Sequence, residues 1–132
     1  MSVRVMVVDD TDHVRTMLTE MLTLGGFDVV ASCAGADEAI ARVDAANPQV
    51  VIMDLRMPDR DGLECTRELK ARRPGQAVIL YTAYLDDDTE SSARDAGVAL
   101  CVAKAGGLSE LEREVSRLAL EMVQGQDHAG DA

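Results

Sequence analysis

Aromatic residues are almost absent from this sequence. It contains no tryptophan, one phenylalanine and two tyrosines, an aromatic share of 2% in 132 residues. Any hydrophobic core must therefore be built from aliphatic residues, methionine and alanine. The apolar share of 47% is enough for the core of one domain, and the length leaves little room for a second.

Cysteine is also scarce. Cys33, Cys65 and Cys101 lie far apart, are odd in number and form no C-x-x-C pair, which argues against a disulfide framework or a zinc site. Free thiols are typical of a reducing compartment. No segment has the apolar length of a signal peptide or a membrane span. We therefore expect a cytoplasmic protein with no membrane partner.

Positive charge is the third shortage. The sequence has 13 basic and 24 acidic residues, a formal net charge of −11. Such a surface repels phosphate backbones, so this chain alone is a poor candidate for binding nucleic acid or anionic membranes. Solubility is the simplest interpretation of the acidic excess. A requirement for a cation needs evidence from a site.

Five short apolar runs predict strands. They are almost continuously apolar rather than alternating, as expected for strands that are buried on both faces. The runs cover Val3–Val8, Phe27–Ser32, Val50–Met53, Ala77–Tyr81 and Ala99–Ala103.

Stretches with helical spacing follow each run. The first four cover about residues 14–24, residues 36–46, Gly62–Arg72 and about Asp87–Ala96. A capping box of Ser109 and Glu112 predicts the start of a fifth helix, which reaches about Met122. Five βα units predict an α/β fold, with a parallel sheet covered by helices on both faces. We expect the folded domain to span residues 1–123 and the polar segment 124–132 to be a disordered tail or a truncated linker.

The predicted strands end in residues that carry chemistry. Asp9 and Asp10 follow the first run, Asp54 the third, Thr82 the fourth and Lys104 the fifth. Each has a simple explanation when taken alone, such as a helix cap or a solvated loop residue. In an open parallel sheet, however, the carboxyl ends of the strands form the ligand-binding edge. Three carboxylates that converge there cannot all stay ionised without a cation, and oxygen ligands favour Mg²⁺.

The sequence resembles the receiver domain of two-component response regulators. The resemblance covers about residues 3–122 and is carried by the segments VMVVDD, VVIMDLRMPDRDGLE, VILYTA and CVAK. It implies a flavodoxin-like three-layer sandwich of five βα units with strand order 2-1-3-4-5. It also implies a phosphoacceptor switch rather than an enzyme, loaded by a sensor histidine kinase or a histidine phosphotransfer protein. The fourth helix, fifth strand and fifth helix would then contact a downstream protein, an output domain or a second copy of the chain.

The resemblance assigns a role to each residue at the strand ends. Asp54 matches the phosphoacceptor. Asp9, Asp10 and Asp54 match the Mg²⁺ site, together with the backbone carbonyl of Arg56. Thr82 and Ala83 match the switch, and Lys104 matches the cation that pairs with phosphoryl oxygens. Arg56 and Tyr84 occupy the two positions that flank the phosphoryl group in this family. Their bulk predicts hindered attack by water and a long-lived phosphorylated form.

Two positions depart from the family pattern. Ala105 follows Lys104, where the family commonly has a cis-proline, so we expect a trans bond. Cys101 replaces the usual aromatic residue, so Thr82 cannot couple to a ring in the usual way. Tyr84 is one candidate for a moving ring, and a loop tyrosine that shields the site is the other interpretation.

An enzyme is the strongest rival interpretation. Asp10-Thr11-Asp12-His13-Val14 resembles the D-x-D-x-V motif of haloacid-dehalogenase-type phosphatases, in which Asp10 would be the nucleophile and Asp12 the general acid/base. That interpretation lacks a downstream acidic metal motif and leaves Asp54 unexplained. A flavin or nucleotide module would need a glycine-rich loop after the first strand, and none is present.

One question lies within the receiver family. The chain is either a stand-alone receiver or the receiver half of a helix-turn-helix transcription factor whose output domain has been removed. The missing proline favours the second alternative and the length of the chain favours the first.

Overall fold

The computed structural model describes the backbone of residues 2–130 and the side chains up to Met122. Its strands are β1 (Arg4–Val8), β2 (Asp28–Cys33), β3 (Val50–Met53), β4 (Ala77–Thr82) and β5 (Leu100–Ala103). Its helices are α1 (Asp12–Leu24), α2 (Ala36–Ala46), α3 (Gly62–Arg72), α4 (Asp87–Ala96), the short 3₁₀ helix η1 (Lys104–Gly106) and α5 (Gly107–Gly130). None of the described helices is long and apolar enough to cross a membrane.

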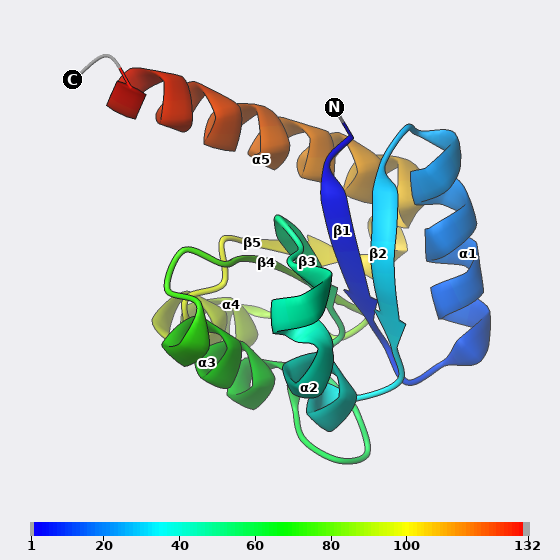
Figure 1. Ribbon diagram of the computed structural model, residues 1–132. Coiled ribbons are helices and arrows are strands. Elements are labelled where there is room, and N and C mark those ends of the chain that lie inside the picture. Colours follow the sequence, from blue (N-terminus) through cyan, green and yellow to red (C-terminus); the bar gives the residue numbers. More distant parts are fainter. Residues whose placement is uncertain (1, 131–132) are drawn as a thin grey trace.

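The five strands form one parallel sheet in the order β2-β1-β3-β4-β5. Helices α1 and α5 cover one face of the sheet, and α2, α3 and α4 cover the other (Figure 1). This is the flavodoxin-like three-layer sandwich that the sequence predicts, and the fold prediction is confirmed. The strand order reverses beside β1, which places a ligand-binding edge at the carboxyl ends of β1 and β3.

Each central strand contributes to two separate cores. Val5 and Val7 of β1 pack with Leu18 and Leu111 on the α1/α5 face. Met6 and the other alternate residues of β1 pack against α2 and α3 on the opposite face. Because successive side chains of a strand point to opposite faces, both sets must be apolar. This double burial explains why the strands read as continuous apolar runs.

The last helix differs from its prediction. α5 begins at Gly107 rather than at Ser109, so the proposed capping box lies inside the helix and its use as the start signal is wrong. The chain passes from η1 into α5 through Gly107, whose φ of +84° suits glycine and makes this direct junction accessible. The helical backbone continues to Gly130, beyond the predicted domain boundary at residue 123. Residues 131 and 132 lie outside the described part, and the assignment of 124–132 as tail or linker stays a prediction.

Aspartates cap two of the helices. The side chain of Asp61 accepts hydrogen bonds from the backbone N–H groups of Leu63 and Glu64 at the start of α3. Asp86 accepts one from the N–H of Thr89 at the start of α4. These local bonds satisfy donors that have no partner within the helix. Helix α2 begins differently, because its N-cap residue is Gly35 and carries no side chain to accept such a bond.

Candidate functional site

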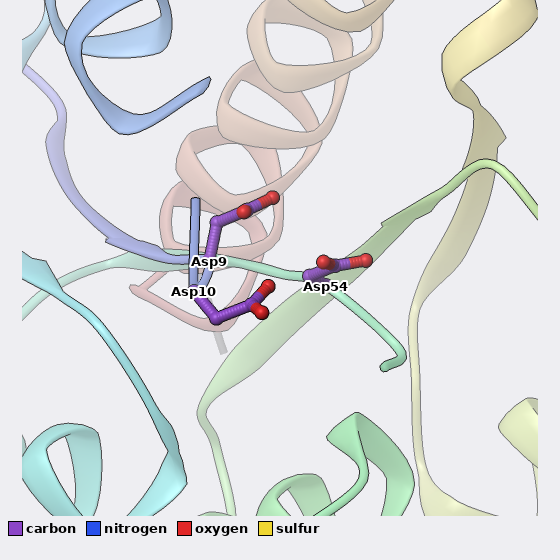
Figure 2. Close-up of side chains that lie close together, drawn as sticks. All are labelled: Asp9, Asp10 and Asp54. Atoms are coloured by element: carbon purple, nitrogen blue, oxygen red, sulfur yellow. The ribbon is translucent and has the colours of Figure 1, made fainter. Parts of the chain in front are cut away.

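Three carboxylates meet at the carboxyl edge of the sheet. Asp9 and Asp10 follow β1 and Asp54 follows β3, and one carboxylate oxygen from each lies within 4.8 Å of the other two. Figure 2 shows the carboxylates of Asp9 and Asp10 turned toward that of Asp54. The pairing of β1 with β3 brings the strand ends together, and the N–H of Asp54 donates to the carbonyl of Val8 at 2.9 Å. The sheet therefore positions the cluster that the sequence predicts.

Lys104 joins this cluster from the end of β5, the outermost strand on one side of the sheet. Its Nζ lies 3.0 Å from Oδ2 of Asp9 and 3.6 Å from Oδ1 of Asp54. Burial disfavours the charged ammonium, but the hydrogen bond to Asp9 and the charge of Asp54 raise the pKa of Lys104 above its usual range. The lysine therefore remains a cation and balances one of the three carboxylates.

The charged form of Asp54 is disfavoured by its surroundings. Burial and the neighbouring negative charge of Asp9 raise its pKa from 3.8 to about 6, although Lys104 offsets part of the effect. The side chain is only 12% exposed. Ionised Asp54 is thus short of positive charge, and a cation or a proton would relieve it.

The two neighbouring aspartates have different surroundings. Asp9 is buried, and its second oxygen, Oδ1, accepts the backbone N–H of Thr11 at 2.9 Å. Asp10 is exposed, and no hydrogen bond or ion pair of its side chain is found among the described side chains. Asp10 is therefore the freer oxygen donor of the pair. The oxygens around Mg²⁺ span about 4 Å across an octahedron, which is close to the size of this cluster.

Thr82 is buried at the end of β4, beside this edge. Its hydroxyl oxygen accepts the backbone N–H of Tyr84 at 3.1 Å. Ala83 lies between them and is exposed. The hydroxyl oxygen of Thr82 is thus engaged as an acceptor with its own loop, and its O–H can still donate to another group.

Arg56, in the loop after β3, and Tyr84, in the loop after β4, lie against each other. The guanidinium carbon of Arg56 is 4.7 Å from the centre of the Tyr84 ring, within the range of a cation–π contact. Tyr84 is 60% exposed. The ring lies on the surface against Arg56, and both interpretations of Tyr84, as a moving ring and as a loop residue that shields the site, stay predictions.

The two departures from the family pattern have structural counterparts. No cis peptide bond occurs among the described residues, so the Lys104–Ala105 bond is trans as expected. The chain after Lys104 forms the 3₁₀ turn η1. Cys101 is half-buried in β5, and burial raises the pKa of its thiol. Each of the three cysteines is free.

Sequence reasoning missed two residues that touch this site. Arg15 donates from Nη1 to the backbone carbonyl of Asp9 at 2.6 Å and also forms an ion pair with Asp12. The ring of buried Tyr81 lies 5.7 Å from Nζ of Lys104. The spacing of Asp12 and Arg15 on one helix face was the available signal for the first. For the second, the signal was a tyrosine next to Thr82 in a chain with few aromatics.

The chain matches the family model of the response regulator receiver domain over residues 5–116. It belongs to this family, whose members are phosphoacceptor switches of two-component systems. The match supports the receiver interpretation over the phosphatase alternative.

Individual relatives agree with this assignment. The response regulator GacA of Pseudomonas protegens is 36% identical over 114 residues, covering 86% of this chain and 54% of GacA. The DNA-binding transcriptional activator DevR/DosR of Mycobacterium tuberculosis is 38% identical over 114 residues, covering 86% of this chain and 52% of that protein. A two-component response regulator of the LuxR family from Aurantimonas sp. SI85-9A1 superposes with a TM-score of 0.85 at 28% identity, covering 89% of this chain and 85% of that one. The chain thus spans about half the length of these two curated relatives.

Proposed function

We propose that Asp54 is the residue that accepts the phosphoryl group. The observation that carries this proposal is the convergence of Asp54 with Asp9, Asp10 and Lys104 at one edge of the sheet. Asp54 is partly accessible and its carboxylate is held close to a cation, which suits an oxygen nucleophile that must meet an anionic donor. Asp9 is less suited to this role because both of its oxygens already accept hydrogen bonds.

The phosphodonor in this proposal is a histidine of a sensor kinase or of a phosphotransfer protein. A carboxylate oxygen of Asp54 attacks phosphorus and forms a P–O bond as the P–N bond to the imidazole breaks. The imidazole keeps the electron pair and takes up a proton, while Asp54 becomes an acyl phosphate. Lys104 lies near enough to Asp54 to pair with an oxygen of the transferred group and to stabilise its charge.

Asp9, Asp10, Asp54 and the backbone carbonyl of Arg56 would hold Mg²⁺, with Asp10 as a direct ligand and Asp9 acting through water. Three clustered carboxylates and the raised pKa of Asp54 fit a divalent cation with oxygen ligands. When bound, Mg²⁺ neutralises charge on the transferring phosphoryl group. Arg15 and Thr11 keep Asp9 in place for this arrangement through the two bonds described above.

Thr82 and Ala83 would form the switch. A phosphoryl oxygen on Asp54 offers the hydroxyl of Thr82 a charged acceptor, and such hydrogen bonds are stronger than neutral ones. Turning inward to donate its O–H to that oxygen would carry the hydroxyl of Thr82 away from the N–H of Tyr84, and the loop before α4 would rearrange. The change would reach the surface of α4, β5 and α5, where a downstream protein, an output domain or a second copy of the chain would bind.

Arg56 and Tyr84 would govern how long the phosphoryl group lasts. Their contact places a guanidinium and a ring side by side at the two positions that flank the phosphoryl site in the family. Water would have to approach past this pair to hydrolyse the acyl phosphate. We infer slow self-dephosphorylation.

The experiment is phosphorylation by acetyl phosphate, followed by intact mass. Wild type with Mg²⁺ should gain one phosphoryl group, and Asp54→Asn should gain none. The adduct should disappear when EDTA replaces Mg²⁺. An adduct that persists in Asp54→Asn but not in Asp10→Asn would instead favour Asp10 as the nucleophile. A wild type that gains no adduct from acetyl phosphate or from purified histidine kinases would refute the proposal.

A second candidate concerns the whole protein. Two relatives that match over most of this chain are about twice as long, and one is named as a DNA-binding transcriptional activator. The chain would then be the receiver half of a cytoplasmic transcription factor, with the signal passing through α5 into the output domain. The continuous helix to Gly130 supports such a connection. The length of the native protein, measured by mass spectrometry of the purified endogenous product, distinguishes this from a stand-alone receiver.

A further inference from the structure

The loop between β3 and α3 is tied to a helix that is distant in the sequence. The carboxylate of Asp59 in this loop accepts the backbone N–H of Ala36 at 3.2 Å and that of Asp37 at 2.9 Å, both in the first turn of α2. It also accepts the N–H of its neighbour Arg60 at 2.9 Å. One side chain therefore bridges two segments that lie more than twenty residues apart along the chain.

The start of α2 is shaped to receive this carboxylate. Gly35, the N-cap residue, makes no side-chain capping bond. A Cβ at Gly35 would lie 2.9 Å from Oδ1 of Asp59, so a larger residue would push the carboxylate away. The backbone N–H of Asp37, followed by those of Ala36 and Arg60, lowers the pKa of Asp59 below its usual range. Asp59 thus supplies from another segment the cap that α2 lacks.

Arg60 reinforces the same connection. Its Nη2 lies 2.8 Å from Oδ1 of Asp37 on α2, and its Nη1 lies 2.7 Å from Oε2 of Glu68 on α3. The guanidinium therefore spans from the first turn of α2 to the middle of α3. Asp59 and Arg60 together fix the outer part of the loop from both sides, through the backbone of α2 and the side chains of two helices.

The inner part of the same loop adjoins the phosphoacceptor. The N–H of Gly62 donates to the carbonyl of Leu55 at 2.7 Å and closes the loop on itself. A Cβ at Gly62 would lie 2.2 Å from the carbonyl oxygen of Asp54, so only glycine permits this approach. Arg56 lies within this closed loop, three residues before Asp59. Because the loop is closed at Gly62 and held at Asp59, we expect a shift of Asp59 to move the backbone of Arg56.

We propose that Asp59 is a positioning residue for the metal site, holding the loop so that the carbonyl of Arg56 faces the three carboxylates. This inference rests on the proposed function, because it takes that carbonyl as a Mg²⁺ ligand. It gives the MPDRDG segment a task beyond forming a turn. It also gives α2 a part in the site, since the first turn of this helix contributes no ligand in the proposal but provides the N–H groups of Ala36 and Asp37 that hold Asp59.

The test is the Mg²⁺ affinity of the folded chain, measured by isothermal titration calorimetry. Asp59→Ala should weaken Mg²⁺ binding by about tenfold, which is the usual scale for removing a group that orients a metal ligand. Asp59→Asn keeps one acceptor oxygen, which can retain the bonds to Ala36 and Arg60, and should fall between wild type and Asp59→Ala. Urea unfolding in EDTA, followed by circular dichroism, checks that each variant is folded under the titration conditions.

Glu38→Ala is the matched control. Like Asp59, Glu38 is an acidic residue whose carboxylate accepts a backbone N–H near the start of α2, that of Ala34 at 2.9 Å. Glu38 itself lies in the first turn of α2. No contact of Glu38 with the β3–α3 loop is found among the described side chains. Its removal should leave Mg²⁺ affinity within about twofold of wild type while lowering stability on the scale of a lost cap.

The outcomes separate the inference from the function on which it rests. If folded Asp59→Ala and Asp59→Asn both bind Mg²⁺ as tightly as wild type, the positioning role is refuted and the phosphoacceptor proposal stands. An equal loss in Glu38→Ala would also refute it, because α2 stability alone would then explain the effect. If wild type binds no Mg²⁺, or Asp54→Asn binds it equally well, the proposed metal site is itself wrong.

Discussion

Replacing Asp54 by asparagine should make the metal-free protein more stable. The fold holds this carboxylate beside Asp9 in a place where it is 12% exposed, and its pKa is raised from 3.8 to about 6. An acid whose pKa is raised by folding binds its proton more tightly in the folded state, so its ionisation favours unfolding. The destabilisation is absent below pH 3.8, grows up to about pH 6 and is complete at neutral pH.

The size of the effect follows from the shift. Two pKa units at 1.36 kcal/mol each correspond to about 3 kcal/mol at pH 7. The attraction of Lys104 is already included in the shifted pKa, so replacing the ionised carboxylate by neutral asparagine of the same shape should gain about 3 kcal/mol. With a urea dependence of about 1–3 kcal/mol per molar, the unfolding midpoint should rise by about 1–3 M. At pH 5 wild-type Asp54 is mostly protonated in the folded state, and the gain should fall to about half.

Urea unfolding in EDTA at both pH values, followed by far-ultraviolet circular dichroism, measures this. Asp28→Asn is the control, because it removes one negative charge from an exposed position at the start of β2. It should shift the midpoint by far less than Asp54→Asn does. Saturating MgCl₂ should stabilise wild type and reverse much of the difference. A midpoint that falls in Asp54→Asn, or a gain that does not shrink at pH 5, would refute the reasoning.

Three further predictions concern the same site. Lys104→Ala leaves buried Asp9 without its cation and should lower stability in EDTA by about 3 kcal/mol, partly recovered by Mg²⁺; an unchanged urea midpoint would contradict this. Mg²⁺ affinity should weaken by up to about tenfold per pH unit below about pH 6, because a proton on Asp54 competes with the metal, and a flat profile in calorimetric titrations would count against it. Tyr84→Ala should speed the loss of the phosphoryl group several-fold while Tyr84→Phe, which keeps the ring against Arg56, should not; equal rates in a time course of intact mass would remove the shielding role.

Much of the fold could be predicted because the central strands are buried on both faces. Runs such as Val50–Met53 have no polar side chain to place and match the observed strand from end to end. The cluster of Asp9, Asp10, Asp54 and Lys104 was accessible for a related reason. Parallel strands end at one edge, so residues that follow them in the sequence must gather there. Topology alone was enough to bring them together.

What could not be predicted depends on contacts between segments that are distant in the sequence. The capping box at Ser109 is a sound local signal, but the 3₁₀ turn after Lys104 and the positive φ of Gly107 start α5 earlier. The bonds from Asp59 to α2 have no pattern that spacing reveals. The same holds for the contact of Arg56 with Tyr84, which requires two loops to be adjacent.

The energetics of Thr82 set a limit on how decisive the proposed switch can be. Its hydroxyl oxygen now accepts a neutral backbone N–H, a bond worth about 1 kcal/mol, which is lost if the side chain turns away from Tyr84 to donate to a phosphoryl oxygen. A hydrogen bond to a charged acceptor is worth about 1.5–3 kcal/mol, so the exchange gains about 0.5–2 kcal/mol. That shifts a two-state equilibrium by about 2–30-fold rather than to completion. Phosphorylation should therefore bias the surface of α4, β5 and α5 only partly, and a partner that binds the shifted loop must supply the rest.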